Sequence, residues 1–181
     1  MAKNRANIIV LDRDGVINVD SDNYIKSAHE WIPEPGSIDA IKAFKQAGWI
    51  VAIATNQSGI KRGYYRRHHL SAMHQKLQQL LGEHGVDWIS YAPYLSEDNS
   101  PVRKPAQGML TAIEQCFNLS LAGMPMVGDT LADMQVARAK KMNPYLVRTG
   151  KGERTLATKE AVLDGIPVYS NLQSVAKALL Q

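Results

Sequence analysis

The sequence is poor in cysteine and contains no long apolar run. Cys116 is the only cysteine in 181 residues, which excludes an internal disulfide and a cysteine-rich metal site. The longest apolar stretches fall well short of the ~20 residues that a membrane-spanning helix needs. The apolar run at residues 8–11 is also too short for the core of a secretory signal. We therefore expect a cytoplasmic protein with no membrane association, in which Cys116 is a buried structural thiol.

Linkers, repeats and low-complexity segments are missing as well. Residues 1–181 are therefore expected to form a single domain, and since no assembly surface is evident, a monomer. The net charge of +4 suits an anionic substrate but is weak evidence for nucleic-acid binding. We interpret the densest basic segment, residues 61–69 (KRGYYRRHH), as the solvated start of a helix.

Strand and helix patterns alternate along the chain. Strands are predicted at residues 8–12, 49–56, 86–95, 124–129, 144–150 and 166–170, and helices at residues 36–48, 70–85, 108–118, 130–142 and 172–180. This order predicts an α/β fold of the Rossmann-like, doubly wound kind, with a mostly parallel sheet and helices on both faces.

Three finer expectations concern the helices. Ser37 is placed to cap helix 36–48, which Gly48 would end. Leucines and a methionine form the expected core stripe of helix 70–85: Leu70, Met73, Leu77, Leu80 and Leu81. The histidines near this helix, at positions 68, 69 and 74, have no set of metal ligands around them and are interpreted as solvated or helix-packing side chains.

Polar residues follow several of the predicted strands. Asp12 and Asp14 come after the first strand, residues 55–58 (TNQS) end the second, and Asp129 follows the fourth. In open parallel sheets, ligands bind outside the carboxyl ends of the strands, so these groups are expected to meet at one rim. Clustered carboxylates suit Mg²⁺, and an aspartate can serve as a nucleophile in phosphoryl transfer while a second carboxylate moves protons.

Four motifs carry a resemblance to a known family. DRDG at residues 12–15, TNQSG at 55–59, RKP at 103–105 and GDTLAD at 128–133 resemble the motifs of the haloacid dehalogenase (HAD) superfamily of phosphatases. The resemblance implies that Asp12 is the nucleophile and Asp14 the general acid/base. It implies that Thr55 and Lys104 hold the phosphoryl group. The Mg²⁺ ligands would be Asp12, Asp129 and the backbone carbonyls of Asp14 and Thr130, with Asp133 as an accessory carboxylate.

Longer stretches around these motifs resemble one subfamily, which contains heptose bisphosphate and histidinol-phosphate phosphatases and has no large cap domain. The resemblance implies a small sugar bisphosphate as substrate and hydrolysis of the 7-phosphate of D-glycero-D-manno-heptose 1,7-bisphosphate, on the route to ADP-heptose and lipopolysaccharide core. Substrate contacts are expected from Asp20, Ser21, Asp22, Asn23, Asn56, Gln57, Ser58 and Arg103. Histidinol phosphate is the alternative substrate; a polynucleotide 3′-phosphatase and a non-catalytic scaffold are less favoured.

One departure from the subfamily concerns zinc. Its members commonly bind a structural Zn²⁺ through a Cys-x-His pair and a Cys-x-Cys pair before RKP. The matching positions here are Ala92, Tyr94, Ser100 and Val102, so no zinc is expected. The loop would instead be held by its two prolines, Pro93 and Pro101, and by packing of Tyr91, Tyr94 and Leu95.

Overall fold

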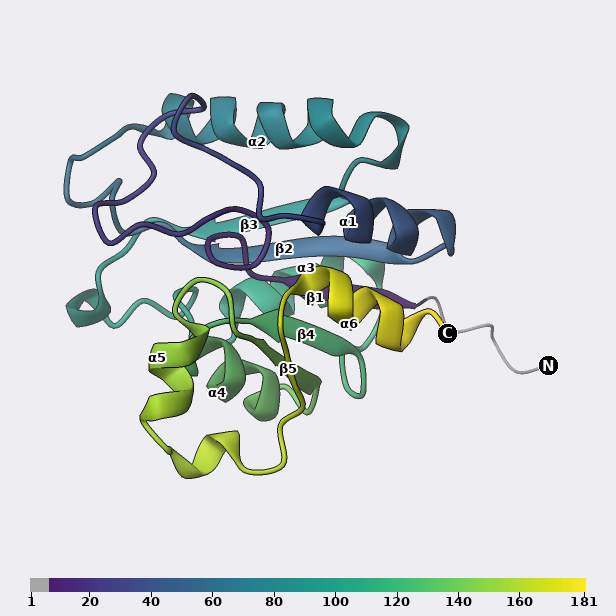
Figure 1. Ribbon diagram of the computed structural model, residues 1–181. Helices are drawn as coiled ribbons and strands as arrows, with labels where there is room; N and C mark the ends of the chain where they lie inside the picture. The colour runs from purple at the N-terminus through teal and green to yellow at the C-terminus, as the bar shows by residue number, and fades with distance from the viewer. Residues whose placement is uncertain (1–6) are drawn as a thin grey trace.

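The computed structural model describes residues 7–181 and contains a six-stranded sheet in which every pairing is parallel (Figure 1). The strands are β1 (Ile8–Leu11), β2 (Ile50–Asn56), β3 (Trp88–Ala92), β4 (Pro125–Gly128), β5 (Asn143–Val147) and β6 (Val168–Tyr169). Their spatial order is β3-β2-β1-β4-β5-β6. The predicted fold class is confirmed. The residues before position 7, which entered the expectation about a secretory signal, lie outside the described part of the chain.

Helices cover both faces of the sheet (Figure 1). The helices are α1 (Ser37–Gln46), α2 (Arg67–Leu81), α3 (Gly108–Phe117), α4 (Leu131–Ala139), α5 (Gly152–Ala157) and α6 (Leu172–Leu179), with short 3₁₀ turns η1 (Gly82–His84), η2 (Ser96–Asp98) and η3 (Ala161–Leu163). Helices α1, α2 and α6 share one core cluster, α3 and α4 share a second, and Met134 of α4 packs in a small third cluster with Leu146 and Ile166. Helix α5 was not predicted from the sequence.

Strand β1 explains why the sheet is buried on both sides. Ile9 and Leu11 point into the cluster beneath α1, α2 and α6, whereas Ile8 and Val10 point into the cluster beneath α3 and α4. All four side chains are fully buried. A strand covered on both faces needs a continuous apolar run, and each such side chain contributes roughly 1.5–3 kcal/mol on burial. The strand that carries Asp12 at its end is therefore held rigidly.

Three expectations about side chains on the helices were wrong. Ser37 is the first residue of α1 and makes no cap; its hydroxyl donates to the Ile17 carbonyl over 2.6 Å, and Gly36 with φ 77° occupies the cap position. Leu80 is 40% exposed and Cys116 is exposed. In both helices the buried stripe advances by four residues at this point, to Leu81 and to the partly buried Phe117, so the residue before it falls beside the core.

The basic segment 61–69 was expected to be the solvated start of a helix. It is mostly exposed, but only residues 67–69 belong to α2; the preceding residues form a loop in which Tyr65 is buried. His74, further along α2, is partly buried, and burial together with the charge of Arg13 lowers its pKa to about 4. It is thus a helix-packing imidazole. Within residues 7–181, no helix has both the length and the apolar character needed to cross a membrane.

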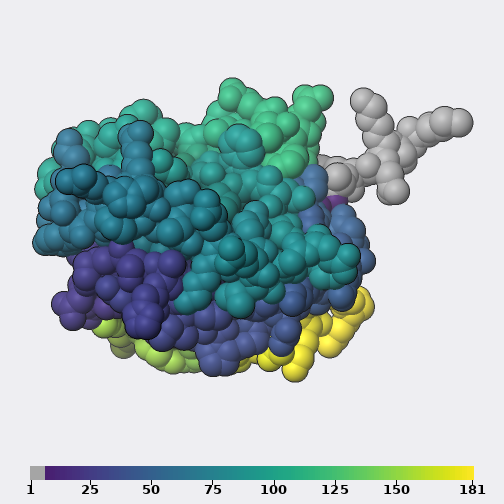
Figure 2. All heavy atoms as spheres, turned by 90° about the horizontal axis from the view of Figure 1, so that it is seen from above, coloured from purple at the N-terminus to yellow at the C-terminus, as the bar shows by residue number. Residues whose placement is uncertain are grey.

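The connection from β1 to α1, residues 12–36, contains isolated bridges but no helix or strand, so it forms no separate cap. Figure 2 shows this purple segment packed beside the blue-teal start of α2. The Lys76 ammonium on α2 ties it down by donating to the carbonyls of Ala28 and Trp31 over 2.7 and 2.6 Å. The segment therefore lies at the carboxyl end of the sheet, close to the polar strand ends.

Candidate active site

A cavity of about 420 Å³ opens where β1, β2 and β4 end. Most of the expected site residues line it: Asp12, Asp14, Asp20, Ser21, Asp22, Thr55, Asn56, Gln57, Ser58, Arg103, Lys104, Asp129 and Thr130. Asn23 is not among the lining residues. The volume lies in the range of small-molecule sites. Separate strands deliver these side chains, and they line one cavity at the carboxyl ends of the strands.

Two glycines allow the acidic side of this cavity to close around Asp129. Gly15 has φ 81° and Gly150 has φ 59°, conformations that favour glycine. A Cβ at either position would collide with the Asp129 carboxylate. The loops after β1 and β5 can therefore approach the carboxylate closely, and the backbone N–H of Lys151 donates to Asp129 Oδ2 over 2.7 Å.

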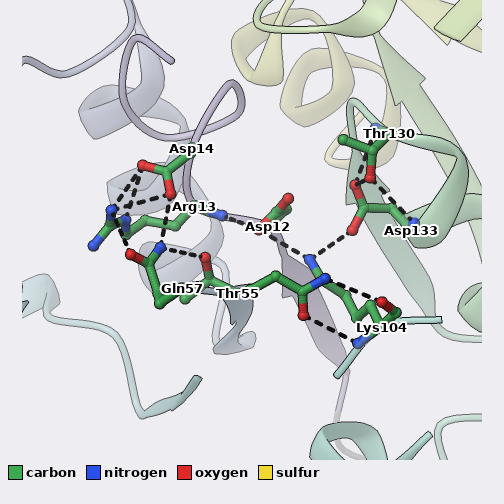
Figure 3. A network of polar contacts seen from close by, with 9 residues as sticks. Asp12, Arg13, Asp14, Thr55, Gln57, Lys104, Thr130 and Asp133 are labelled. Atoms are coloured by element: carbon green, nitrogen blue, oxygen red, sulfur yellow. Dashed lines mark hydrogen bonds and ion pairs between the residues drawn. The ribbon is translucent and has the colours of Figure 1, made fainter. Parts of the chain in front are cut away.

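Three buried carboxylates gather on this side: Asp12, Asp129 and Asp133 each offer one oxygen within 4.8 Å of the others. The Lys104 ammonium lies 3.0 Å from Asp12 Oδ1 and 2.6 Å from Asp133 Oδ1 (Figure 3). Lys104 therefore pairs with two of the three carboxylates, and this acidic side as a whole is short of positive charge.

The pKa values follow from that imbalance. Burial and the charge of Asp133 raise the pKa of Asp12 to about 7, although Lys104 acts against them. Burial and the charge of Asp12 likewise raise the pKa of Asp129 well above its usual range. Asp129 Oδ1 is buried and has no hydrogen-bond partner within the described part of the chain. A hard divalent cation would supply both the missing charge and the missing partner, so the residues present fit such an ion.

Asp133 and Thr130 organise the start of α4. Thr130 is the N-cap, and both its backbone N–H and its hydroxyl donate to Asp133 Oδ2, over 3.0 and 2.6 Å. The other oxygen of Asp133 accepts from Lys104. Asp133 is thus fully engaged in holding the lysine and the helix terminus. This agrees with an accessory part for its carboxylate.

The Asp14 carboxylate is turned away from Asp12, toward a separate group of donors (Figure 3). Arg13 binds it through Nη2, at 2.8 and 3.0 Å from the two oxygens, and through Nε at 3.2 Å. The amides of Asn18 and Gln57 donate over 2.9 and 2.7 Å. Burial acts to raise the pKa of Asp14, but Arg13 and these hydrogen bonds outweigh it, so the pKa lies below its usual range.

The end of β2 and the residue that follows it, Gln57, supply side chains that connect the two sides of the cavity. Gln57 Nε2 also donates to Thr55 Oγ1 over 2.9 Å, and the Tyr65 hydroxyl donates to Gln57 Oε1 over 2.5 Å. Asn56 exchanges two hydrogen bonds with the backbone of Lys104, at 3.0 and 3.1 Å. This exchange fixes the lysine backbone to the end of β2. Burial raises the pKa of Tyr65 to about 12, so its hydroxyl stays protonated.

The residues expected to contact substrate lie on loops at the rim. Asp20 pairs with Lys151 at 3.0 Å, and Asp22 pairs with Arg154 through two contacts at 2.9 and 2.8 Å. These pairs join the loop after β1 to the start of α5. Lys151, which follows β5, was not among the expected site residues, because the polar residues predicted at strand ends were those of the first, second and fourth strands. Arg13 and Tyr65 were missed because nothing in their local pattern indicates burial.

Hydrogen bonds hold the loop that lacks zinc ligands. Arg103 Nη1 donates to the Tyr94 carbonyl over 3.0 Å, and the Leu95 N–H donates to Asp98 Oδ2 over 2.8 Å at η2. Tyr91 packs on the core as expected. The expected packing of Tyr94 was wrong, because its side chain is 37% exposed; only its backbone takes part.

Comparisons with known proteins identify the family of this chain. The family model described as polynucleotide kinase 3 phosphatase matches residues 7–143. The chain is 49% identical over 176 residues to the D-glycero-beta-D-manno-heptose-1,7-bisphosphate 7-phosphatase of Pseudomonas aeruginosa, covering 96% of this chain and 98% of that one. The corresponding protein of Pseudomonas putida is 47% identical over 175 residues, with 96% and 99% covered.

A solved structure matches over almost the whole chain. The D,D-heptose 1,7-bisphosphate phosphatase of B. bronchiseptica, complexed with magnesium and phosphate, superposes with a TM-score of 0.92 at 44% identity and covers 97% of this chain and 98% of its own. The chain belongs to the HAD superfamily and is a phosphatase of that superfamily. Within it, the chain belongs to the polynucleotide kinase 3 phosphatase family.

Proposed function

We propose that this phosphatase hydrolyses the 7-phosphate of D-glycero-D-manno-heptose 1,7-bisphosphate in the cytoplasm, as a monomer, on the route to ADP-heptose and lipopolysaccharide core. One observation carries the proposal: Asp12, Lys104 and Asp129 meet in a cavity large enough for a small sugar phosphate. Relatives named as heptose bisphosphate 7-phosphatases support the choice of substrate.

Asp12 is the proposed nucleophile. The Lys104 ammonium, 3.0 Å from Asp12 Oδ1, would hold a phosphoryl oxygen next to the attacking carboxylate. The backbone N–H of Arg13 donates to the same Asp12 oxygen over 2.7 Å, which leaves Oδ2 as the atom that attacks. The attack would form an aspartyl-phosphate, and Thr55 would hold a second phosphoryl oxygen.

Asp14 is the proposed general acid and base. It would protonate the leaving sugar oxygen and then take a proton from the water that attacks the aspartyl-phosphate. Since its carboxylate now accepts from Arg13, Asn18 and Gln57, it must turn from at least one of them to reach the leaving oxygen. The donors thus define the orientation from which Asp14 acts.

Asp12 and Asp129, with the backbone carbonyls of Asp14 and Thr130, are the proposed Mg²⁺ ligands. When bound, the ion would neutralise the clustered carboxylates and the charge on the phosphoryl oxygens. The orphan Asp129 Oδ1 and the raised pKa values of Asp12 and Asp129 support this assignment. Arg103, at the rim, would bind the second phosphate bidentately.

The test is phosphate release from a panel of substrates: heptose 1,7-bisphosphate in both anomers, histidinol phosphate, fructose 1,6-bisphosphate and a 3′-phosphorylated oligonucleotide. Each is measured with Mg²⁺ and with EDTA, and Asp12→Asn is the blank. We expect selective, Mg²⁺-dependent turnover of a heptose bisphosphate that disappears in the variant. Preference for histidinol phosphate or for the oligonucleotide would overturn the substrate assignment and leave the nucleophile standing. Turnover that survives in Asp12→Asn would overturn the mechanism.

A further inference from the structure

A buried hydrogen-bond chain runs from Tyr65 to the side chains proposed for catalysis. Tyr65 is 4% exposed, and its hydroxyl donates to Gln57 Oε1 over 2.5 Å. Gln57 is 3% exposed, and its Nε2 donates to both Asp14 Oδ2 and Thr55 Oγ1. The chain therefore ends on the proposed acid/base and on a proposed phosphate-holding hydroxyl at the same time.

The orientation of the Gln57 amide determines whether this hydrogen-bond chain can donate to Asp14 and Thr55. Both donors from the protein side, the Tyr65 hydroxyl and Arg13 Nη2 at 3.3 Å, point at the amide oxygen. The amide nitrogen must then face Asp14 and Thr55, which it does at 2.7 and 2.9 Å. If the amide were turned over, its oxygen would face the Asp14 carboxylate with no proton between them. The short bond from Tyr65 is the stronger of the two contacts that prevent this.

We propose that Tyr65 is a positioning residue for the phosphatase reaction: by fixing the amide of Gln57, it sets the orientation of Asp14, whereas Thr55 is held in place by its position within β2. The inference rests on the proposed acid/base part of Asp14. Tyr65 itself does not need to touch the substrate. It acts through Gln57, because in the part of the chain that the structure describes its hydroxyl has Gln57 Oε1 as its hydrogen-bond partner.

Substrates with different leaving groups distinguish a positioning role of Tyr65 from a purely structural role. A sugar alkoxide is a poor leaving group and needs a proton from a well-placed acid, whereas p-nitrophenolate leaves without one. Misplacing Asp14 should therefore slow attack on a sugar phosphate and spare the first turnover of p-nitrophenyl phosphate. Loss of folding or of Asp12 geometry would slow both.

The experiment compares Tyr65→Phe with Tyr64→Phe, a matched control that removes the hydroxyl of the neighbouring, 54% exposed tyrosine. In Tyr65→Phe we expect kcat for heptose 1,7-bisphosphate to fall about fivefold to tenfold, the effect of one buried hydrogen bond. KM for heptose 1,7-bisphosphate should stay within about twofold of the wild-type value. The burst rate of p-nitrophenolate release should also stay within about twofold of the wild-type rate. Tyr64→Phe should match the wild type on both substrates.

A double-mutant cycle tests whether Tyr65 acts through Gln57. In a Gln57→Met background, Tyr65→Phe should cost less than about twofold, because the amide it would position is already gone. An equal loss on both substrates, a fully additive double variant, or a Tyr65→Phe enzyme that matches the wild type would overturn the inference. If the wild type releases p-nitrophenolate but does not turn over heptose bisphosphate, only the substrate assignment fails. The comparison then uses whichever sugar phosphate of the panel is hydrolysed.

Discussion

The two sides of the cavity hold the same kind of side chain in opposite electrostatic surroundings. On one side, Asp12 and Asp133 share the Lys104 ammonium, and one oxygen of the neighbouring Asp129 has no hydrogen-bond partner among residues 7–181. On the other side, Asp14 alone receives hydrogen bonds from a guanidinium and two amides. Accordingly the pKa values of Asp12 and Asp129 are raised, whereas that of Asp14 is lowered.

This contrast separates two uses of a carboxylate. The acidic side is incomplete without added positive charge, which is what a site for a divalent cation requires. On the donor-rich side, protein donors satisfy the Asp14 carboxylate without an added ion, so they hold it in one orientation. Two aspartates separated by one residue thus serve different purposes because the elements packed around them differ.

The largest expected effect comes from removing one carboxylate from the acidic side. Asp129→Asn should lower kcat by more than about 100-fold, because a proposed Mg²⁺ ligand is lost. Without divalent ions the variant should be at least as stable as the wild type, since a like charge is removed. The measurements are phosphate release and Tm with Mg²⁺ or EDTA. A variant that Mg²⁺ still stabilises as strongly as the wild type would contradict the assignment of Asp129 to the metal site.

Breaking the donor-rich side should mainly cost stability. Arg13→Met leaves the Asp14 carboxylate without its cation, and we expect the free energy of unfolding to fall by about 3 kcal/mol. The outward-facing Arg66→Met, on an exposed residue, is the matched control and should be close to neutral. Urea denaturation checks both. Equal stability of the two variants would mean that Asp14 does not depend on Arg13.

The smallest expected effect concerns pH. The pKa of His74 is lowered from 6.5 to about 4 in the folded chain, so between these values the unfolded chain binds a proton that the folded chain does not. Its contribution to stability is therefore present above about pH 6.5 and lost as the pH falls to about 4, by at most about 3 kcal/mol. His74→Leu should remove this dependence.

Asp12 acts in the opposite sense over a similar range. Its pKa is raised from 3.8 to about 7, so its contribution is present below about pH 4 and is lost as the pH rises through 7 in EDTA. Unfolding of wild type and His74→Leu in EDTA, measured from pH 4 to 7.5, separates the two. The free energy of unfolding of the wild type minus that of His74→Leu should increase as the pH rises from 4 to 6.5. A difference that does not change with pH would contradict the assignment to His74.

Sequence patterns were sufficient wherever the signal is local. The fully apolar run of β1 requires burial on both faces, and alternating patterns required a parallel sheet with helices on each side. Since parallel strands end at one rim, Asp12, Thr55 and Asp129 could be brought together without knowing any distance. Predictions of burial at the edge of a helical stripe were wrong, as at Leu80 and Cys116. A step of three residues along a helix and a step of four end about a third of a turn apart, so the pattern alone does not say which of two adjacent residues is buried.

The amino-acid sequence by itself thus determined the fold class, the edge of the sheet where the site lies, and the residue types that meet there. Only the tertiary structure decided which aspartate faces which partner, because Arg13, Gln57 and Tyr65 come together through packing between segments distant in the chain. The same holds for Lys151, which joins the loop after β5 to Asp129 and Asp20. Local pattern specifies where strands end; the charge balance around a buried carboxylate depends on contacts that no local pattern contains.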